Sequence, residues 1–383
     1  MCDILKHTTM KTGDKTMKKI HRTLSLFTVT AMCAALLCSC GAVSDSSQTD
    51  SSSKAATTTT ADTTADTTTT GEASSTASAA SAPDSSVSDS SSAVTDDTKT
   101  NGITPAMWKV TSPEGNTMVM LGSFHALKDE CYPLPEAVTN AYNNADILAV
   151  ECDITSTSED GEYMKNLMKQ MLYNDNTKLS QHISEEAYSA LQTYLGYWGM
   201  DISALEVYRP WAVSSTLDTL LIQDSGFDSE NGLDNFLLTT AHADGKEIYE
   251  VESVDFQMNL LINFSDDIYD LMFRSYEGET KESQKQALED LYTAWKSGDI
   301  ETFLEEDNEE ELAGYTEEDK KIAEDYNNQM LYDRNKNMAK AAEDLMSQGK
   351  NVFYVVGAAH YAGEGGIIDL LEKDGYTAER VQY

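Results

Sequence analysis

The sequence has few basic residues. Its 383 residues include 27 lysines and arginines against 65 aspartates and glutamates, which gives a formal net charge of −38 at pH 7. Such an excess of negative charge repels nucleic acid phosphates and anionic lipid head groups. We therefore exclude a nucleic-acid partner, and we interpret the acidity as a solvated surface that favours solubility outside the cell.

Cysteine is also scarce, with six in the whole chain. Only Cys131 and Cys152 lie in the part that we expect to fold. Two thiols make no disulfide framework, and the sequence leaves open whether they pair with each other or are each buried as free thiols.

Several common catalytic motifs are absent. The chain contains no Gly-x-Ser-x-Gly, Gly-x-Gly-x-x-Gly, phosphate-loop, His-Glu-x-x-His or Cys-x-x-Cys pattern. Their absence disfavours serine hydrolases of that type, dinucleotide-dependent enzymes and the common zinc peptidases.

Residues 1–40 have the pattern of a short N-terminal extension followed by a bacterial lipoprotein signal peptide. A basic segment that follows Met17, the predicted start, precedes an apolar run at 24–37 that is too short to span a bilayer permanently. The run leads into Leu-Cys-Ser-Cys-Gly at 37–41, with a small residue directly before Cys40. We predict lipidation of Cys40 and anchoring to the extracellular face of the bacterial membrane. An uncleaved N-terminal anchor is the alternative.

Residues 41–101 consist almost entirely of Ser, Thr, Ala and Asp, with no aromatic side chain. Such a segment cannot bury enough apolar surface to offset the entropy lost on ordering. We predict a disordered tether that holds the domain at 102–383 away from the membrane.

The pattern of residues 102–383 predicts an α/β fold. Strands are expected at 107–110, 117–122, 147–150, 247–252, 351–356 and 378–382. Helices are expected at 135–144, 160–173, 184–199, 210–223, 232–244, 253–263, 266–275, 282–296, 317–347 and 365–373. Apolar strands without polar alternation suit a mixed, mostly parallel central sheet covered on both faces, with a helical insertion in the middle.

Two strand ends share one form. Residues 119–125 and 354–360 each run from an apolar strand through Gly and two further residues to a His, at His125 and His360. This weak symmetry predicts that the sheet is built from two pseudo-repeated halves.

Four predicted strands end in side chains that bind metals or carry protons, at His125, Glu151, Glu252 and His360. Ligands of open parallel sheets bind outside the carboxyl ends of the strands. Two imidazoles with one or two carboxylates are a normal ligand set for Zn, Mn, Co or Fe. The sequence therefore predicts a hydrolytic metal site, in which Glu151 or Glu252 can act as the general base.

Structural interpretations of these and nearby residues stay open at this stage. Glu252 can instead cap the helix that follows it. Asp153 reaches the site only if its strand continues that far. We expect His182 to be exposed before a helix that Ser184 caps, and His242 to complement a helix dipole.

The domain resembles the TraB/GumN family, which includes the TIKI proteases. The resemblance rests on pieces that occur in family order: 108–110, 121–125, 132–135, 145–153, 209–211, 232–234, 245–246, 251–252, Gln257, 334–335, 357–360, Gly363 and Gly366. They cover nearly all of 105–383 and are specific as a set.

The resemblance implies a metal-dependent hydrolase fold related to the erythromycin esterase and ChaN-like groups. It implies metal or catalytic roles for His125, Glu151 and His360. Glu252 and Arg334 inherit a catalytic-site role, in shaping the site or binding a substrate carboxylate. A helix-surface ion pair is the alternative for Arg334.

Two departures from the family pattern, at 233–234 and at Tyr361, are expected to affect the pocket wall more than metal chemistry. The expected activity is hydrolysis of a secreted peptide or protein with a divalent metal, Mn, Co or Zn, as cofactor. The alternatives are a surface lipoprotein that binds a peptide or haem without catalysis, and an interaction protein whose site has decayed.

Overall fold

The structure, a computed structural model, describes residues 102–155, 160–304 and 315–383. The predicted signal peptide, the lipidation of Cys40 and the tether at 41–101 lie outside the described residues. Within the described part of the chain, no helix has the length and apolar character needed to cross a membrane.

One six-stranded sheet organises the domain, in the order β4-β3-β5-β2-β1-β6. The strands are β1 (Met107–Thr111), β2 (Thr117–Ser123), β3 (Ile147–Val150), β4 (Glu247–Glu250), β5 (Val352–Gly357) and β6 (Thr377–Arg380). Neighbours among β4, β3, β5 and β2 pair in parallel, while β1 is antiparallel to both β2 and β6. The predicted mixed α/β architecture is confirmed. The pseudo-repeat and the ChaN-like relationship stay predictions.

Burial explains why the inner strands form where they do. Every residue of β3 and β5 is buried, as expected for apolar strands that are covered on both faces. The β1–β2 hairpin turns at Gly115, whose φ of 90° is readily accessible only to glycine. The parallel pairing of β4, β3, β5 and β2 then brings four carboxyl strand ends to one edge of the sheet.

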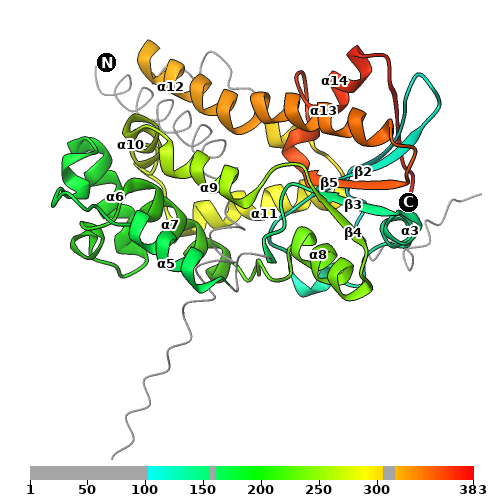
Figure 1. Cartoon of the computed structure of the whole chain (residues 1–383). Helices are drawn as coiled ribbons and strands as arrows, with labels where there is room; N and C mark the ends of the chain where they lie inside the picture. The colour runs from blue at the N-terminus through cyan, green and yellow to red at the C-terminus, as the bar shows by residue number, and fades with distance from the viewer. Residues whose placement is uncertain (1–101, 156–159, 305–314) are drawn as a thin grey trace, which may run out of the picture. The chain divides into compact units, whose positions relative to one another are not determined.

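Helices surround the sheet and extend beyond it. They are α3 (Glu136–Asn144), α5 (Gly161–Gln170), α6 (Glu185–Tyr197), α7 (Pro210–Asp224), α8 (Leu233–Asp244), α9 (Val254–Asn263), α10 (Asp266–Arg274), α11 (Lys281–Ser297), α12 (Glu317–Asn327), α13 (Asp333–Met346) and α14 (Ile367–Lys373). Figure 1 shows α5, α6, α7, α9 and α10 grouped to one side of the sheet, which is the predicted helical insertion.

The helix predicted over 317–347 is interrupted. A π-helical turn, Asn328–Tyr332, joins α12 to α13, and Figure 1 shows these two helices running one after the other. The wider turn precedes Arg334, whose Nη1 donates a hydrogen bond to the carbonyl oxygen of Met330 at 3.1 Å. Because π turns shift the side chains that follow them, they are common near functional sites.

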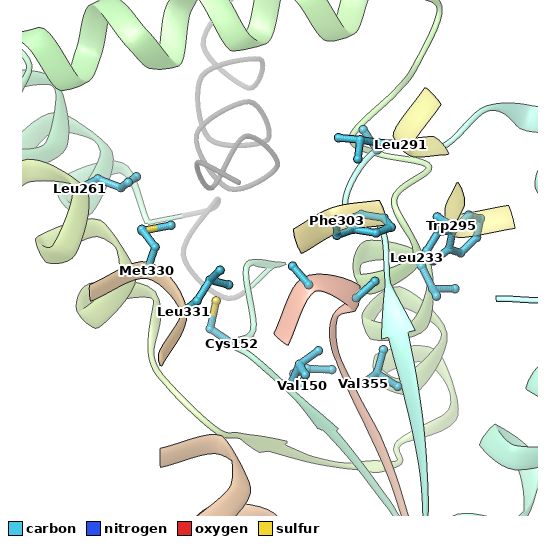
Figure 2. Packing of buried hydrophobic residues seen from close by; sticks show 14 of the residues in the cluster. Val150, Cys152, Leu233, Leu261, Leu291, Trp295, Phe303, Met330, Leu331 and Val355 are labelled. Atoms are coloured by element: carbon cyan, nitrogen blue, oxygen red, sulfur yellow. The ribbon is translucent and has the colours of Figure 1, made fainter. Parts of the chain in front are cut away.

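The hydrophobic core packs helices against the sheet. Figure 2 shows Val150 of β3 and Val355 of β5 together with Leu233 of α8 and Trp295 of α11, all of them buried. In the same view Leu331 and Met330 lie near Cys152, with Leu261 farther away, and all four are buried. The carboxyl strand ends therefore lie within packed structure, which holds their side chains firmly.

Neither cysteine of the described domain forms a disulfide. Cys131 and Cys152 are both buried as thiols. The Cys131 sulfur lies 3.0 Å from the hydroxyl of Tyr292, and the Cys152 thiol donates to the side-chain oxygen of Gln257 at 3.5 Å. Of the two arrangements that the sequence left open, the structure has the buried thiols.

An ion pair between Arg274 of α10 and Asp319 of α12 predicts an acid-sensitive element of stability. Burial alone would raise the pKa of Asp319, but Arg274 and Thr316 hold it below its ordinary value. The ionised form therefore stabilises the fold above the unfolded pKa of about 4, and this contribution is lost as the pH falls below it.

We expect Asp319→Asn to lower the free energy of unfolding at pH 7 by about 1–3 kcal/mol. The difference in the free energy of unfolding between Asp319→Asn and wild type should be smaller at pH 3 than at pH 7. Urea denaturation at both pH values measures it. Asp344→Asn is the matched control, because Asp344 and its partner Lys340 are both exposed. An equal effect of Asp319→Asn at the two pH values would contradict the prediction.

Candidate active site at the strand ends

Three of the predicted site residues surround one point above the end of β5. A Cβ atom added to Gly357 would lie 3.1 Å from Glu151 Oε1, 3.5 Å from His125 Nε2 and 3.6 Å from His360 Cδ2. We call the region between these three groups, on the side of Gly357 that a Cβ atom would face, the site centre. The two imidazoles, 235 residues apart by their numbers (360 minus 125), therefore meet beside one carboxylate.

His125 follows β2 and is oriented by α8. Its Nδ1 lies 2.8 Å from Oδ2 of Asp234, in the first turn of α8. The Asp234 carboxylate accepts the Nδ1 proton. The other ring nitrogen, Nε2, is the one that faces the site centre. Burial alone would lower the pKa of His125, but Asp234, with a contribution from Glu151, raises it to about 9.

Gly232 allows α8 to come so close to His125. A Cβ atom at Gly232 would lie 2.0 Å from the carbonyl oxygen of His125. Non-bonded atoms cannot come this close, so only glycine fits at this position. The neighbouring Leu233 N–H donates to the carbonyl oxygen of Phe124 at 3.1 Å. The close approach of the two backbones thus brings Asp234 within reach of the imidazole.

His360 lies on a short 3₁₀ helix, Ala358–Tyr361, directly after β5. Its Nδ1 lies 2.6 Å from Oδ1 of Asn335, and because an amide oxygen only accepts, Nδ1 carries the proton. Burial, reinforced by the nearby Arg334, lowers the pKa of His360 to about 3. The ring is therefore neutral, and its Nε2 has a free electron pair 3.8 Å from Glu151 Oε1.

Glu151 comes immediately after β3 and is fully paired, as its burial requires. Its Oε1 accepts from the Gly357 N–H at 2.7 Å, and its Oε2 accepts from Arg334 at 2.7 Å and from Gln257 at 2.9 Å. Burial alone would raise its pKa, but Arg334 and both histidines hold the pKa well below the ordinary value. Glu151 therefore stays ionised.

Arg334 holds two carboxylates at once. Its Nε and Nη2 donate to the two oxygens of Glu252, each at 2.8 Å, and Nη2 also donates to Glu151. Arg334 is only 4% exposed, so the surface ion pair considered for it is wrong. The capping role for Glu252 is also wrong, because the hydroxyl of Ser253 caps α9 by accepting from the Phe256 N–H.

The two remaining histidines of the described residues belong to other interactions. His242 lies in the last turn of α8, near the helix end as expected. Its Nε2 also lies 2.8 Å from Oδ2 of Asp153, so it contacts a carboxylate as well. Because β3 ends at Val150, Asp153 is not part of the strand.

His182 is not simply exposed: its side chain is 25% exposed, stacks on Tyr173 and lies 2.8 Å from Asp266. Ser184 caps α6 as predicted.

Several residues of the site were not among the predicted ones. They are Asp234, Gln257, Asn335 and Gly357. All four fall within the family-like pieces of the sequence, which was the signal available. Their contacts come from segments far apart in the chain, so spacing alone could not assign them.

Both departures from the family pattern have roles other than a pocket wall. Asp234 contacts His125 directly, so it bears on the chemistry of that imidazole. Tyr361 is buried, stacks on Trp108 with ring centroids 4.9 Å apart, and donates to the carbonyl oxygen of Tyr354. The expectation for these positions was wrong because both side chains are used inside the fold.

The donor set fits a divalent metal in its chemistry. Both imidazoles are hydrogen-bonded through Nδ1, to Asp234 and Asn335, and this outer hydrogen bond is typical of metal-bound histidines. Glu151 Oε1 faces the site centre beside His125 Nε2, and it lies 3.8 Å from His360 Nε2. Among the described residues, however, no group of three or more His, Cys, Asp or Glu side chains is arranged so that it could hold a metal ion as it stands.

A sequence profile of the TraB/PrgY/gumN family matches residues 106–380. The chain belongs to this family. "Uncharacterized protein YbaP" of Escherichia coli strain K12 is 26% identical over 157 residues, which are 41% of this chain and 56% of that protein. "Metalloprotease TIKI homolog" of Nematostella vectensis is 24% identical over 293 residues, 65% of this chain and 61% of the relative.

"Metalloprotease TIKI2" of Danio rerio is 24% identical over 188 residues, 45% of this TraB-family chain and 36% of the relative. The chain thus spans less than two thirds of the length of these relatives. No solved structure gives a significant match to it.

The contact between Asp234 and His125 predicts a loss of ligand binding without a loss of fold. We expect Asp234→Ala to weaken binding of a divalent metal by about 10–100-fold, because the imidazole is no longer oriented. Calorimetric titration with MnCl2 and CoCl2 measures this. Asp255→Ala is the control, since Asp255 is an exposed acid in the first turn of α9. Equal affinities of Asp234→Ala and wild type would contradict the role of Asp234.

Proposed function

We propose that this TraB-family protein is a metal-dependent hydrolase that cleaves peptide bonds in an extracellular peptide or protein. The observation that carries the proposal is the convergence of His125 Nε2, the ring of His360 and Glu151 Oε1 on the site centre. The relatives named as TIKI metalloproteases support peptide-bond hydrolysis as the reaction class.

A divalent ion such as Mn, Co or Zn, when bound there, supplies a water of lowered pKa and polarises the substrate carbonyl. His360 would hold it through Nε2, and so would His125 once its Nε2 proton is released on binding. Glu151 Oε1 would be the third donor or the proton acceptor. Asp234 and Asn335 keep each imidazole in the tautomer that presents Nε2. Arg334 and Gln257 keep the Glu151 carboxylate ionised and turned toward the site centre.

The local charge balance supports a cation at this site. Glu151, Glu252 and Asp234 contribute three carboxylates, against the Arg334 guanidinium and a protonated His125, whose pKa is about 9. His360 is neutral because of its burial and the neighbouring Arg334. The remaining negative charge favours a positive charge between the imidazoles.

The proposal places the enzyme on the extracellular face of the bacterial membrane. Lipidation at Cys40 would anchor it, and the tether at 41–101 would let the domain reach a secreted peptide or protein. The strongly negative net charge fits a protein partner and not a nucleic acid.

The test is elemental analysis of the purified full chain after equilibration with MnCl2, CoCl2 or ZnCl2. Wild type is compared with His125→Ala and His360→Ala, and with His182→Ala as a control outside the site. We expect bound metal and cleavage of a quenched fluorescent peptide library in wild type and His182→Ala only. Equal metal content in all four proteins would overturn the proposal, and a haem Soret band without peptidase activity would favour the non-catalytic alternative.

A further inference from the structure

Ser123, the last residue of β2, has a buried hydroxyl that the site described above does not use. The residue is 2% exposed, and its Oγ has no hydrogen-bond partner among the described parts of the chain. Leaving a buried hydroxyl unpaired costs about 1–3 kcal/mol. A missing partner beside a candidate active site therefore points to a ligand.

The sheet register determines where this hydroxyl points. Ser123 of β2 pairs with Gly357 of β5 in parallel. Directly paired residues of neighbouring strands project from the same face of a sheet, and the strands lie about 4.8 Å apart. Because the site centre lies on the face toward which a Cβ of Gly357 would point, the side chain of Ser123 projects beside it, roughly one strand spacing from Gly357.

The backbone around Ser123 is held firmly. The carbonyl oxygen of Gly122 accepts from the indole N–H of Trp295 at 3.0 Å, and a Cβ atom at Gly122 would lie 2.9 Å from the Cα of Ala358. Two residues further on, His125 is fixed by Asp234. The hydroxyl and the imidazole are therefore presented by one rigid strand end.

The opposite strand contributes no side chain on this face. Gly357 has no side chain, so the space between Ser123 and the group of Glu151, His125 and His360 is not filled from β5. A serine hydroxyl both donates and accepts, which suits a water molecule or a carbonyl oxygen. An apolar ligand would leave the hydroxyl unpaired.

We propose that Ser123 is a further binding residue of this site, whose hydroxyl forms a hydrogen bond with the oxygen ligand held at the site centre. That ligand is a water molecule in the free enzyme and an oxygen of the scissile peptide group in the complex. The inference rests on the proposed metal-dependent hydrolase and adds a donor from β2 to its site.

The experiment uses the full chain and Co²⁺ alone as the probe, with binding followed by visible absorption and calorimetry. Ser123→Ala is expected to raise the Kd for Co²⁺ about 10-fold, because a hydrogen bond to the ligand shell is lost. Its Tm should equal or exceed that of wild type, since the variant removes an unpaired buried hydroxyl. Ser123→Thr, which keeps the hydroxyl, should bind Co²⁺ as wild type does.

Ser225→Ala is the matched control, because Ser225 Oγ is likewise buried without a partner among the described residues but lies after α7. Ser225→Ala should leave the Kd for Co²⁺ unchanged. Equal Kd values for wild type and a folded Ser123→Ala would overturn the role of Ser123 and leave the metal site standing. If wild type binds no Co²⁺, the metal site and the role of Ser123 both fall.

Discussion

Replacing Arg334 with methionine is expected to lower the free energy of unfolding by roughly 3–5 kcal/mol. Methionine has a similar length and no charge, so it leaves the buried carboxylates of Glu151 and Glu252 without their common cation. Removing one partner of a buried ionic network costs more than the network itself contributes, because the remaining charges cannot reach water. Urea denaturation at pH 7 measures the change.

A surface ion pair on the same helix supplies the control for this prediction. Lys336 pairs with Asp333, and both side chains are 64% exposed. We expect Lys336→Met to change the free energy of unfolding by less than about 0.5 kcal/mol. If Arg334→Met were as mild as Lys336→Met, the buried network would not be the structural element described above.

A second substitution separates charge from packing. Adding Glu252→Gln to Arg334→Met removes one of the two unpaired buried charges, so the double variant should be more stable than Arg334→Met alone. A double variant that is less stable would indicate that Arg334 acts mainly through the space it fills. The comparison also shows whether Glu252 serves the site chiefly by holding Arg334 in place.

Gly357→Ala is expected to lower peptidase activity and Co²⁺ affinity by roughly 100-fold while the fold is retained. The added methyl group would occupy the site centre, 3.1 Å from Glu151 Oε1 and 3.5 Å from His125 Nε2. The backbone at Gly357, with φ −51° and ψ 137°, is accessible to alanine. The N–H bonded to Glu151 also remains, so the substitution tests the occupied space alone.

Gly196→Ala provides the control for a glycine with open surroundings. A Cβ atom at Gly196, in α6, would meet nothing within 4 Å. Alanine should therefore leave activity unchanged and stabilise the helix by about 0.5–1 kcal/mol. Metal binding and activity at wild-type level in Gly357→Ala would show that no ligand occupies the site centre. Circular dichroism and the Tm of both variants verify that they are folded.

The charges around Arg334 help to explain why the two histidines of one site have very different pKa values. The same guanidinium that lowers the pKa of Glu151 also contributes to the low pKa of His360. His125 lies on the other side of the site centre beside Asp234, which raises its pKa to about 9. Two histidines in matched sequence contexts therefore differ in pKa, because His360 is buried near Arg334 whereas His125 lies against the Asp234 carboxylate.

Local pattern was sufficient to predict most of the elements. Apolar runs predicted β3 and β5, which Glu151 and His360 follow. His125 comes two residues after β2, and Glu252 lies two residues beyond β4, which ends at Glu250 and not at the predicted 252. The last strand is displaced, at Thr377–Arg380 against the predicted 378–382. Short exposed edge strands have a weak apolar signal, so their limits depend on pairing with the neighbouring strand.

The partners of the site residues depend on contacts between distant segments. Asp234, Asn335 and Arg334 reach the strand ends from α8 and α13. The sequence marked these residues only through the family-like pieces. Their partners follow from the packing of these helices on the sheet, including the close approach at Gly232 and the π turn before Arg334.

By itself, the sequence determined that an α/β domain carries two Gly-x-x-His strand ends and a strand-end glutamate, because hydrophobic periodicity and strand direction are local properties. Only the tertiary structure decided that these groups surround one point, that Arg334 is buried between two carboxylates, and that Ser123 projects beside them. Register and helix packing bring together residues more than 200 positions apart, such as Glu151 and Gly357. No local pattern encodes such a meeting, because it depends on how whole elements fit against each other.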